Sequence, residues 1–376
     1  MPGKKWMSMR SIVLFSAVFL LTTVGIVCSR PARACPPDHG YHYWQALGSQ
    51  AAFKAVRMMR SRGIRIGAHQ FIALTNAGYA EIGGRATAGV LDGLSLLLGV
   101  GRGDHSLIEV HSAPSSALWV AIYHKRSGFC AYLQVDPEAL VAGQALHASE
   151  KNNLFFIHVL EKIDADHLFA NAQVYAEKFD NKIFGGNEFR IVTIVNAVAA
   201  GAPAAAVRAF EFHDHYCPGV TSGILMACYL KSFFPAAPDG KYFVQSVQPW
   251  CKEDALMVIL NATPGKGGYA VTYPSADDMA AWPAWAENAS TIVYREDPAN
   301  GIWEGIVLGY TGGDTGCPDY GHSVMNKLCA DLWYLSHLWT IPGILSVSCM
   351  NFPWTRAFHR KTWRVRGLIR FLPWSR

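Results

Sequence analysis

The sequence predicts an α+β protein in which one order of helices and strands occurs twice. Of its 376 residues, 51% are hydrophobic and 16% are charged, which is typical of a globular protein with room for two domains. The segments 38–135 and 205–312 each run through a helix, a strand, a second helix with an aspartate near its start, a glycine-rich loop, a strand and a hairpin. A period of this size indicates a degenerate tandem duplication. The alternative is two unrelated α+β segments that share a common order.

The second segment shows the pattern more clearly. Pro218–Phe233 is an apolar run of helical length, Tyr242–Gln248 is strand-like, and Cys251–Leu260 has helical spacing. The loop TPGKGGY then leads into the strand YAVTY, and the turn-rich sequence DPANG separates the two strands of a hairpin.

The first segment repeats this order with different residues. Its first helix, first strand, second helix with loop and strand, and hairpin are expected at 38–56, 69–76, 91–110 and 117–135. Asp92 stands where Asp254 stands in the second segment. We therefore expect the helices that contain these two aspartates to occupy equivalent positions.

The N-terminus is predicted to be a cleaved signal peptide. Three basic residues precede an apolar run over 12–27, and the A-x-A motif at 32–34 is a cleavage signal. A retained membrane anchor is the alternative, although the run is short for a membrane span. We expect cleavage between Ala34 and Cys35 and a periplasmic or secreted protein.

Cleavage also removes the net charge of the chain. The formal charge of +5 comes from 33 basic and 28 acidic residues, and residues 1–34 hold five of the basic and none of the acidic ones. The mature chain is thus balanced, so we predict no nucleic-acid partner. Seven Lys and Arg residues remain together in 356–376, interleaved with aromatic residues. This tail is either a solvated segment or a peripheral contact with an anionic membrane or an acidic partner.

The organisation that follows has five parts. They are a signal peptide, a degenerate domain, a mostly helical connector, a second domain, and a Trp-rich helix with the basic tail, at 1–34, 35–136, 137–205, 206–312 and 313–376. Eight cysteines follow the cleavage point and contain no CxxC motif, so their spacing does not fix a pairing. A Cys35–Cys317 disulfide is one prospect, suggested by the similar sequences CPPDHGYH and CPDYGH.

The stretch HDHYCPG at 213–219 carries the strongest chemical signal. In an extended segment alternate side chains point the same way, so we expect His213, His215 and Cys217 to converge. Two imidazoles and a thiolate suit zinc best, and nickel or cobalt also fit, whereas calcium and magnesium prefer oxygen. Pro218 predicts the start of a helix, whose N-terminus would favour a thiolate at Cys217. The alternative is packed core residues.

A fourth metal ligand is expected from Cys251, which also begins a predicted helix. The alternatives are a Cys217–Cys251 disulfide and an open site with three protein ligands and a water. In the open case Glu253 and Asp254 are candidates for a general base. Lys266, on the glycine-rich loop, is a candidate for binding an anionic ligand or cofactor near the metal, and a structural turn is the alternative there.

Three motifs in this order resemble the E-subunit family of formylmethanofuran dehydrogenase. They are H-x-H-x-C-P-G, C-x-x-D-A and G-K-G, at 213–219, 251–255 and 265–267. The resemblance covers about 205–312 well and 38–135 only as a diverged copy. It implies an α+β domain with a mixed or antiparallel sheet, related in shape to the C-terminal domain of glyceraldehyde-3-phosphate dehydrogenases, with a transition metal near the His/Cys cluster. It also implies pairing of two such domains, which a tandem duplication would supply as a pseudo-dimer in one chain.

The sequence also departs from this family. Its members are usually intracellular associates of a molybdenum or tungsten enzyme, often with a Cys-rich zinc ribbon, whereas this chain is predicted to be exported and has no ribbon motif. In the first copy Asp38, His39 and His42 stand near the place of the cluster. Cys35, His39 and His42 are a candidate second metal site, and surface histidines are the alternative.

The expected function is an exported transition-metal-binding protein that acts as an accessory, carrier or sensor. The alternatives are a metal-dependent enzyme, an accessory subunit of a periplasmic molybdenum or tungsten redox enzyme, and a partner-binding subunit that needs no metal. A protein partner or a homo-oligomer is expected in the accessory case.

Overall fold

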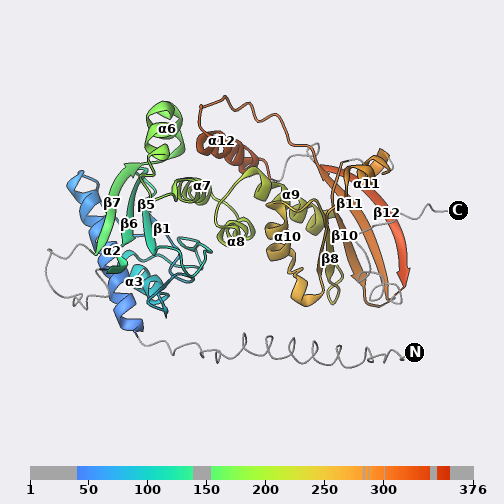
Figure 1. The fold of residues 1–376 in the computed structure, drawn as a ribbon, viewed down its shortest axis with the longest axis horizontal. Coiled ribbons are helices and arrows are strands. Elements are labelled where there is room, and N and C mark those ends of the chain that lie inside the picture. Colours follow the sequence, from blue (N-terminus) through green and yellow to red (C-terminus); the bar gives the residue numbers. More distant parts are fainter. Residues whose placement is uncertain are drawn as a thin grey trace, which may run out of the picture. The chain divides into compact units, whose positions relative to one another are not determined.

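The computed structural model describes residues 40–138, 154–282, 284–286, 288–299, 301–338 and 345–355. The predicted signal peptide, Cys35, His39 and the basic tail lie outside these residues. None of the helices described is long and apolar enough to cross a membrane. The described chain contains two five-stranded sheets of helix-covered α+β structure and a two-stranded ribbon, β2 (Glu81–Ile82) with β3 (Arg85–Ala86) (Figure 1).

The first sheet has the strand order β4-β1-β5-β6-β7. In sequence order its strands are β1 (Phe71–Thr75), β4 (Leu107–Glu109), β5 (Trp119–His124), β6 (Phe129–Val135) and β7 (Phe155–Lys162). Every residue of β1 and β5 is buried, because both faces of the sheet are covered. The helices α2 (Tyr41–Ser61) and α3 (Gly89–Leu98) pack on one face (Figure 1).

The opposite face of the first sheet belongs to a large core shared with helices that follow it in the chain. These are α5 (Ala165–Ala170), α6 (Ala172–Asp180), α7 (Glu188–Ala199), α8 (Ala204–His213) and α12 (Ser323–Ser336). The segment 137–205, predicted to be mostly helical, therefore supplies three helices, but it also supplies β7 as the edge strand of the first sheet.

The second sheet has the strand order β12-β11-β10-β8-β9. In sequence order its strands are β8 (Tyr242–Val247), β9 (Tyr269–Thr272), β10 (Ala289–Asp297), β11 (Ile302–Tyr310) and β12 (Leu345–Thr355). The helices α9 (Pro218–Phe233) and α10 (Lys252–Leu260) pack on one face of it (Figure 1). Three short helices complete this region: η1 (Pro264–Lys266), α11 (Ala276–Ala280) and η2 (Ala284–Ala286).

Both sheets have the same topology. Read from the parallel edge, the order β4-β1-β5-β6-β7 corresponds to β9-β8-β10-β11-β12, with one parallel pair followed by three antiparallel pairs. In each sheet a helix containing the expected aspartate, α3 or α10, lies in the chain between the two parallel strands, which are the edge strand and the strand next to it. We call the segment from α2 to β7 the first unit and that from His213 to β12 the second unit.

The loops after α3 and α10 correspond in backbone conformation as well. Gly99 and Asn261 end the two helices in the left-handed region, with φ of 65° and 57°. Six residues later His105 and Gly267 are again left-handed, with φ of 58° and 63°. This places the two loops in register.

The two helix pairs also cross at matching glycines. A β-carbon on Gly48 of α2 would lie 2.3 Å from the carbonyl oxygen of Val90, and one on Gly223 of α9 would lie 2.4 Å from that of Lys252. Each glycine therefore allows an approach that no larger residue permits.

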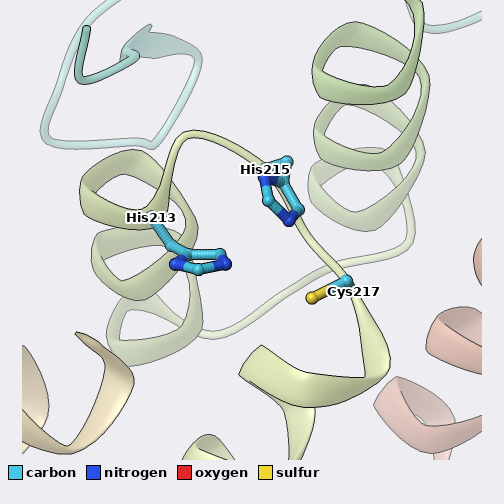
Figure 2. A group of neighbouring side chains, drawn as sticks. All are labelled: His213, His215 and Cys217. Atoms are coloured by element: carbon cyan, nitrogen blue, oxygen red, sulfur yellow. The ribbon is translucent and has the colours of Figure 1, made fainter. Parts of the chain in front are cut away.

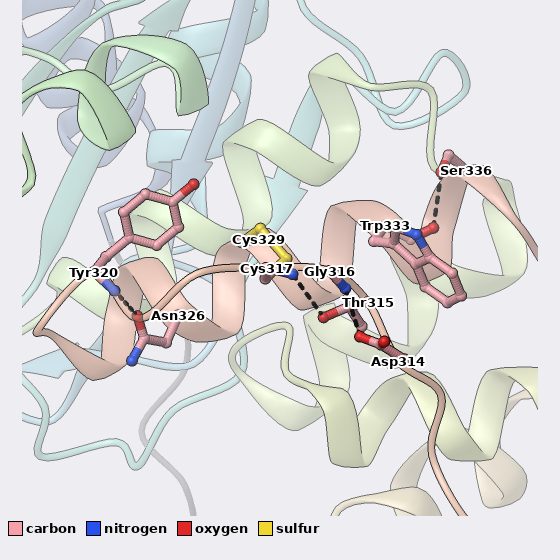
Figure 3. Close-up of a disulfide and its surroundings, with 9 residues drawn as sticks. All are labelled: Asp314, Thr315, Gly316, Cys317, Tyr320, Asn326, Cys329, Trp333 and Ser336. Carbon is pink, nitrogen blue, oxygen red and sulfur yellow. Dashed lines mark hydrogen bonds between the residues drawn. A yellow bond between two sulfur atoms is a disulfide. The ribbon is translucent and has the colours of Figure 1, made fainter.

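The C-terminal region contains the expected helix, α12, and also an edge strand, β12, that the sequence pattern did not predict. A disulfide joins Cys317, in the loop before α12, to Cys329 on that helix (Figure 3). The suggested Cys35–Cys317 pairing is therefore wrong, because Cys317 already has a partner 12 residues away.

Candidate metal centre

The His/Cys stretch forms a turn between two helices. His213 is the last residue of α8, Asp214 follows in the left-handed region with φ of 69°, and Cys217 is the extended N-cap residue of α9. Pro218 occupies the start of α9 as expected. The predicted extended segment with three alternating side chains is wrong, since a helix end and a left-handed turn bring the side chains together instead.

The three side chains nevertheless converge. The potential ligand atoms of His213, His215 and Cys217 all lie within 4.8 Å of one another (Figure 2). Cys217 is only 5% exposed. Nε2 of His213 is buried and has no hydrogen-bond partner among the described residues. A buried nitrogen in this state, facing an imidazole and a thiol, fits a metal ligand.

Carboxylates orient both imidazoles. Nδ1–H of His213 donates to Oδ2 of Asp254, and Nδ1–H of His215 donates to Oδ1 of Asp214, each at 2.6 Å. Because carboxylates only accept, these bonds leave the Nε2 lone pairs available for a metal. Asp214 is itself held by Arg190, whose Nη2 lies 2.8 Å from Oδ2.

Cys251 lies beside Cys217 as the N-cap residue of α10. Each thiol shifts the pKa of the other, and both are free cysteines in the structure. Gly219 makes room for them, since a β-carbon there would lie 3.1 Å from Sγ of Cys251 and 3.6 Å from Sγ of Cys217. The structure thus brings Cys251 to the edge of the cluster.

The hydrogen bonds of the cluster shift its pKa values. Burial lowers the pKa of His213, but the hydrogen bond with Asp254 and the nearby thiol of Cys217 outweigh burial and raise it to about 9. The thiol of Cys217 lowers the pKa of Cys251 to about 7, whereas the thiol of Cys251, together with burial, raises that of Cys217. The thiol that loses its proton first is therefore Cys251, and both cysteines begin helices, so the helix N-terminus alone does not decide between them.

The other predicted site residues divide between the cluster and distant positions. Asp254 contacts the cluster through His213, whereas Glu253 is buried in an ion pair with Lys252 at 2.7 Å. Lys266 is exposed on η1, beyond the C-terminal end of α10, and its Nζ contacts Oδ1 of Asn261. Since Cys251 lies at the opposite end of α10, the structure does not bring Lys266 to the cluster.

The first unit keeps the aspartate and lacks the two cysteines. The hydroxyl of Tyr41 donates to Oδ2 of Asp92 at 2.6 Å, as His213 does to Asp254. Trp44 precedes the crossing glycine Gly48 by as many residues as Gly219 precedes Gly223. In the same way, Gly89 stands as far before Asp92 as Cys251 does before Asp254. His42, on α2, is exposed and lies 3.5 Å from Gln45.

Sequence reasoning missed His111. A cavity of about 370 Å³ lies next to the cluster, lined by His213, Asp254, Asp214 and Phe212 on one side and by His111, Ser112, Ala113 and Pro114 on the other. The second group follows β4 of the first unit. A single histidine after a strand gave no signal, because only the fold brings it to a motif about a hundred residues away.

Comparison with known families gives a match over part of the chain. The family model FmdE, described as "Molybdenum formylmethanofuran dehydrogenase operon", matches residues 212–295. This range contains all four expected metal ligands and Lys266. No curated protein matches the chain. The chain therefore contains a region similar to FmdE, which coincides with the His/Cys cluster and most of the second unit.

Proposed function

We propose that this chain is a transition-metal-binding protein of the FmdE type that acts as an accessory, carrier or sensor. The observation that carries the proposal is the convergence of His213, His215 and Cys217 within 4.8 Å, with a carboxylate on Nδ1 of each imidazole. An orienting carboxylate of this kind fixes the tautomer and strengthens a histidine ligand.

Cys251 completes the ligand set in this proposal. Two thiolates and two neutral imidazoles balance the charge of a divalent ion, whereas three ligands would leave one positive charge in a buried site. The adjacency of the two thiols supports this set. A tetrahedral site with two nitrogen and two sulfur ligands suits zinc, and nickel or another divalent ion is the alternative.

A second candidate is a metal-dependent enzyme or an accessory subunit of a periplasmic molybdenum or tungsten redox enzyme. The cavity beside His213 and Asp254 favours chemistry at the metal. The description of the matching family favours the accessory role. In either case Asp254 is the nearest candidate for a general base.

The proposal includes a degenerate tandem duplication that forms a pseudo-dimer in one chain, with domains related in shape to the C-terminal domain of glyceraldehyde-3-phosphate dehydrogenases. The common topology, the matching left-handed loop residues and the paired crossing glycines support the duplication.

We also propose that the protein is exported to the periplasm or secreted. The leader-like residues 1–34 and the Cys317–Cys329 disulfide support export, because disulfides persist in oxidising compartments. The partners proposed are another protein or a second copy, with no nucleic acid, and a peripheral membrane contact through 356–376.

The test is elemental analysis with thiol counting on protein purified from its native compartment. Wild-type protein should contain bound metal, and Cys217→Ser should lose most of it, because a hydroxyl is a poor ligand for a borderline ion. Cys228→Ser is the matched control, since Cys228 is a free cysteine on the same helix and should not affect the metal. Full metal content in Cys217→Ser would refute the site.

A further inference from the structure

The cavity beside the cluster has a wall that is firmly built from the first unit. The backbone N–H of His111 donates to the carbonyl oxygen of Glu211 at 2.9 Å, and its Nδ1–H donates to that of Phe212 at 3.2 Å. The imidazole stacks on Phe212, with 16° between the ring planes, and packs on Tyr79, with 4.5 Å between the ring centroids. These contacts fix the position of the ring.

An ion-pair network fastens β4 and the loop before it to the end of α8. Arg102 bridges two carboxylates, with Nη2 3.0 Å from Oε2 of Glu211 and Nη1 3.1 Å from Oε2 of Glu109. The backbone N–H of Glu109 donates to Oε1 of Glu211 at 3.1 Å. Glu211 lies two residues before His213. The network therefore holds the end of β4, which the His111 wall follows, against the end of α8, where the cluster begins.

Two side-chain atoms of the cavity remain as acceptors for a ligand. Because Nδ1–H of His111 donates to a carbonyl, Nε2 of its neutral ring carries a lone pair. Oδ2 of Asp254 accepts from His213, which leaves Oδ1 as a second acceptor. Both oxygens of Asp214 are already occupied, by His215 and Arg190. An imidazole nitrogen and a carboxylate oxygen together favour a divalent transition-metal ion over an anion.

The cavity also lies on the accessible side of the centre. Cys217 is almost fully buried, whereas the side chains of His213 and Asp254, which line the cavity, are 14% and 32% exposed. An ion that approaches from solvent through the cavity reaches His213 and Asp254 before it reaches the buried thiol of Cys217.

We propose that this cavity is the loading site through which a divalent metal ion enters and leaves the centre, with His111 as a transient ligand. The proposal rests on the proposed function, since it needs a metal in the His/Cys cluster. It gives the first unit a role in the site of the second, although the first unit lacks the two cysteines. Because His111 contacts the ion only on its way, removing Nε2 should slow uptake and release by the same factor and leave the equilibrium occupancy unchanged.

The test follows Co²⁺ uptake by metal-stripped full-length protein, by stopped-flow detection of the thiolate-to-cobalt absorption. His111→Phe keeps the ring packing and removes the nitrogen, and we expect uptake and chelator-driven release both to slow about tenfold. His158→Phe is the matched control, because Nδ1 of His158 also bonds a carbonyl oxygen, at 3.3 Å, but His158 does not line the cavity. It should keep the wild-type rates.

Two results would overturn the loading site. One is wild-type uptake and release by His111→Phe. The other is faster release with unchanged uptake in His111→Phe, and therefore a lower final occupancy, which would make His111 a permanent ligand. Wild-type protein that takes up no cobalt at all would instead refute the proposed function, so the two failures can be told apart.

Discussion

The two units have the same sheet topology. They differ in the residues at the start of the helices that cover each sheet, α2 and α3 in the first unit and α9 and α10 in the second. In the second unit Gly219 and Cys251 face each other where α9 meets α10, and in the first unit Trp44 and Gly89 occupy these places. The first unit thus has a large residue opposite glycine where the second unit has glycine opposite a thiol. The crossing glycines remain in both units, so the fold depends on the close helix approach, while the donors at the helix starts can change without altering it.

The largest effect should come from the crossing glycines, which test whether the units are built alike. Gly48→Ala and Gly223→Ala should each lower the free energy of unfolding by about 3 kcal/mol, because the new methyl group meets backbone and not a movable side chain. Thermal or urea unfolding measures this. Gly103→Ala and Gly265→Ala are controls with open space around the β-carbon. A tolerated substitution at either crossing would break the comparison.

A smaller loss of stability should follow removal of the disulfide of the second unit. Cys329→Ser opens a 12-residue loop and should lower the free energy of unfolding by about 2–3 kcal/mol through the entropy of the unfolded chain. Unfolding of the variant and of the reduced wild type should agree. If reduction leaves the melting temperature unchanged, the bridge does not contribute to the stability of this region.

Asp254→Asn and Asp92→Asn compare the two aspartates directly. Asp254→Asn should weaken metal binding about 10- to 100-fold, because an amide no longer favours the imidazole tautomer that binds through Nε2. Asp92→Asn should leave metal affinity unchanged, since its partner is the hydroxyl of Tyr41. Competition with a coloured chelator measures both. Equal effects of the two variants would contradict a metal site confined to the second unit.

Metal affinity should also depend on pH, with the direction given by the protons that the metal displaces. The raised pKa of His213, about 9, means that below this pH an ion must displace a proton from the ring. Each proton that the metal must displace weakens binding about tenfold for every pH unit by which the pH is lowered. The pKa of Cys251, about 7, adds a further proton below that pH, so the dependence should steepen there. Chelator competition from about pH 6 to about pH 9.5 measures the slope, and a flat profile would contradict these ligands.

Parts of this picture could be read from the sequence, and parts could not. The helices that begin at Pro218 and after Cys251, and the order of helices and strands in both units, follow from local patterns. The cluster residues were identified by composition, although the backbone that assembles them is a helix end and not a strand. β12, the His111 wall and the remote position of Lys266 depend on tertiary packing, which periodicity does not encode.

X-ray absorption at the zinc edge of the metal-replete protein tests the central claim most directly. With His213, His215, Cys217 and Cys251 as ligands, the spectrum should show two sulfur atoms at about 2.3 Å and two nitrogen atoms at about 2.0–2.1 Å. Cys251→Ser should reduce the sulfur count to one. A wild-type shell with one sulfur and an added oxygen would contradict the closed four-ligand site, and a shell with no sulfur would contradict the metal centre itself.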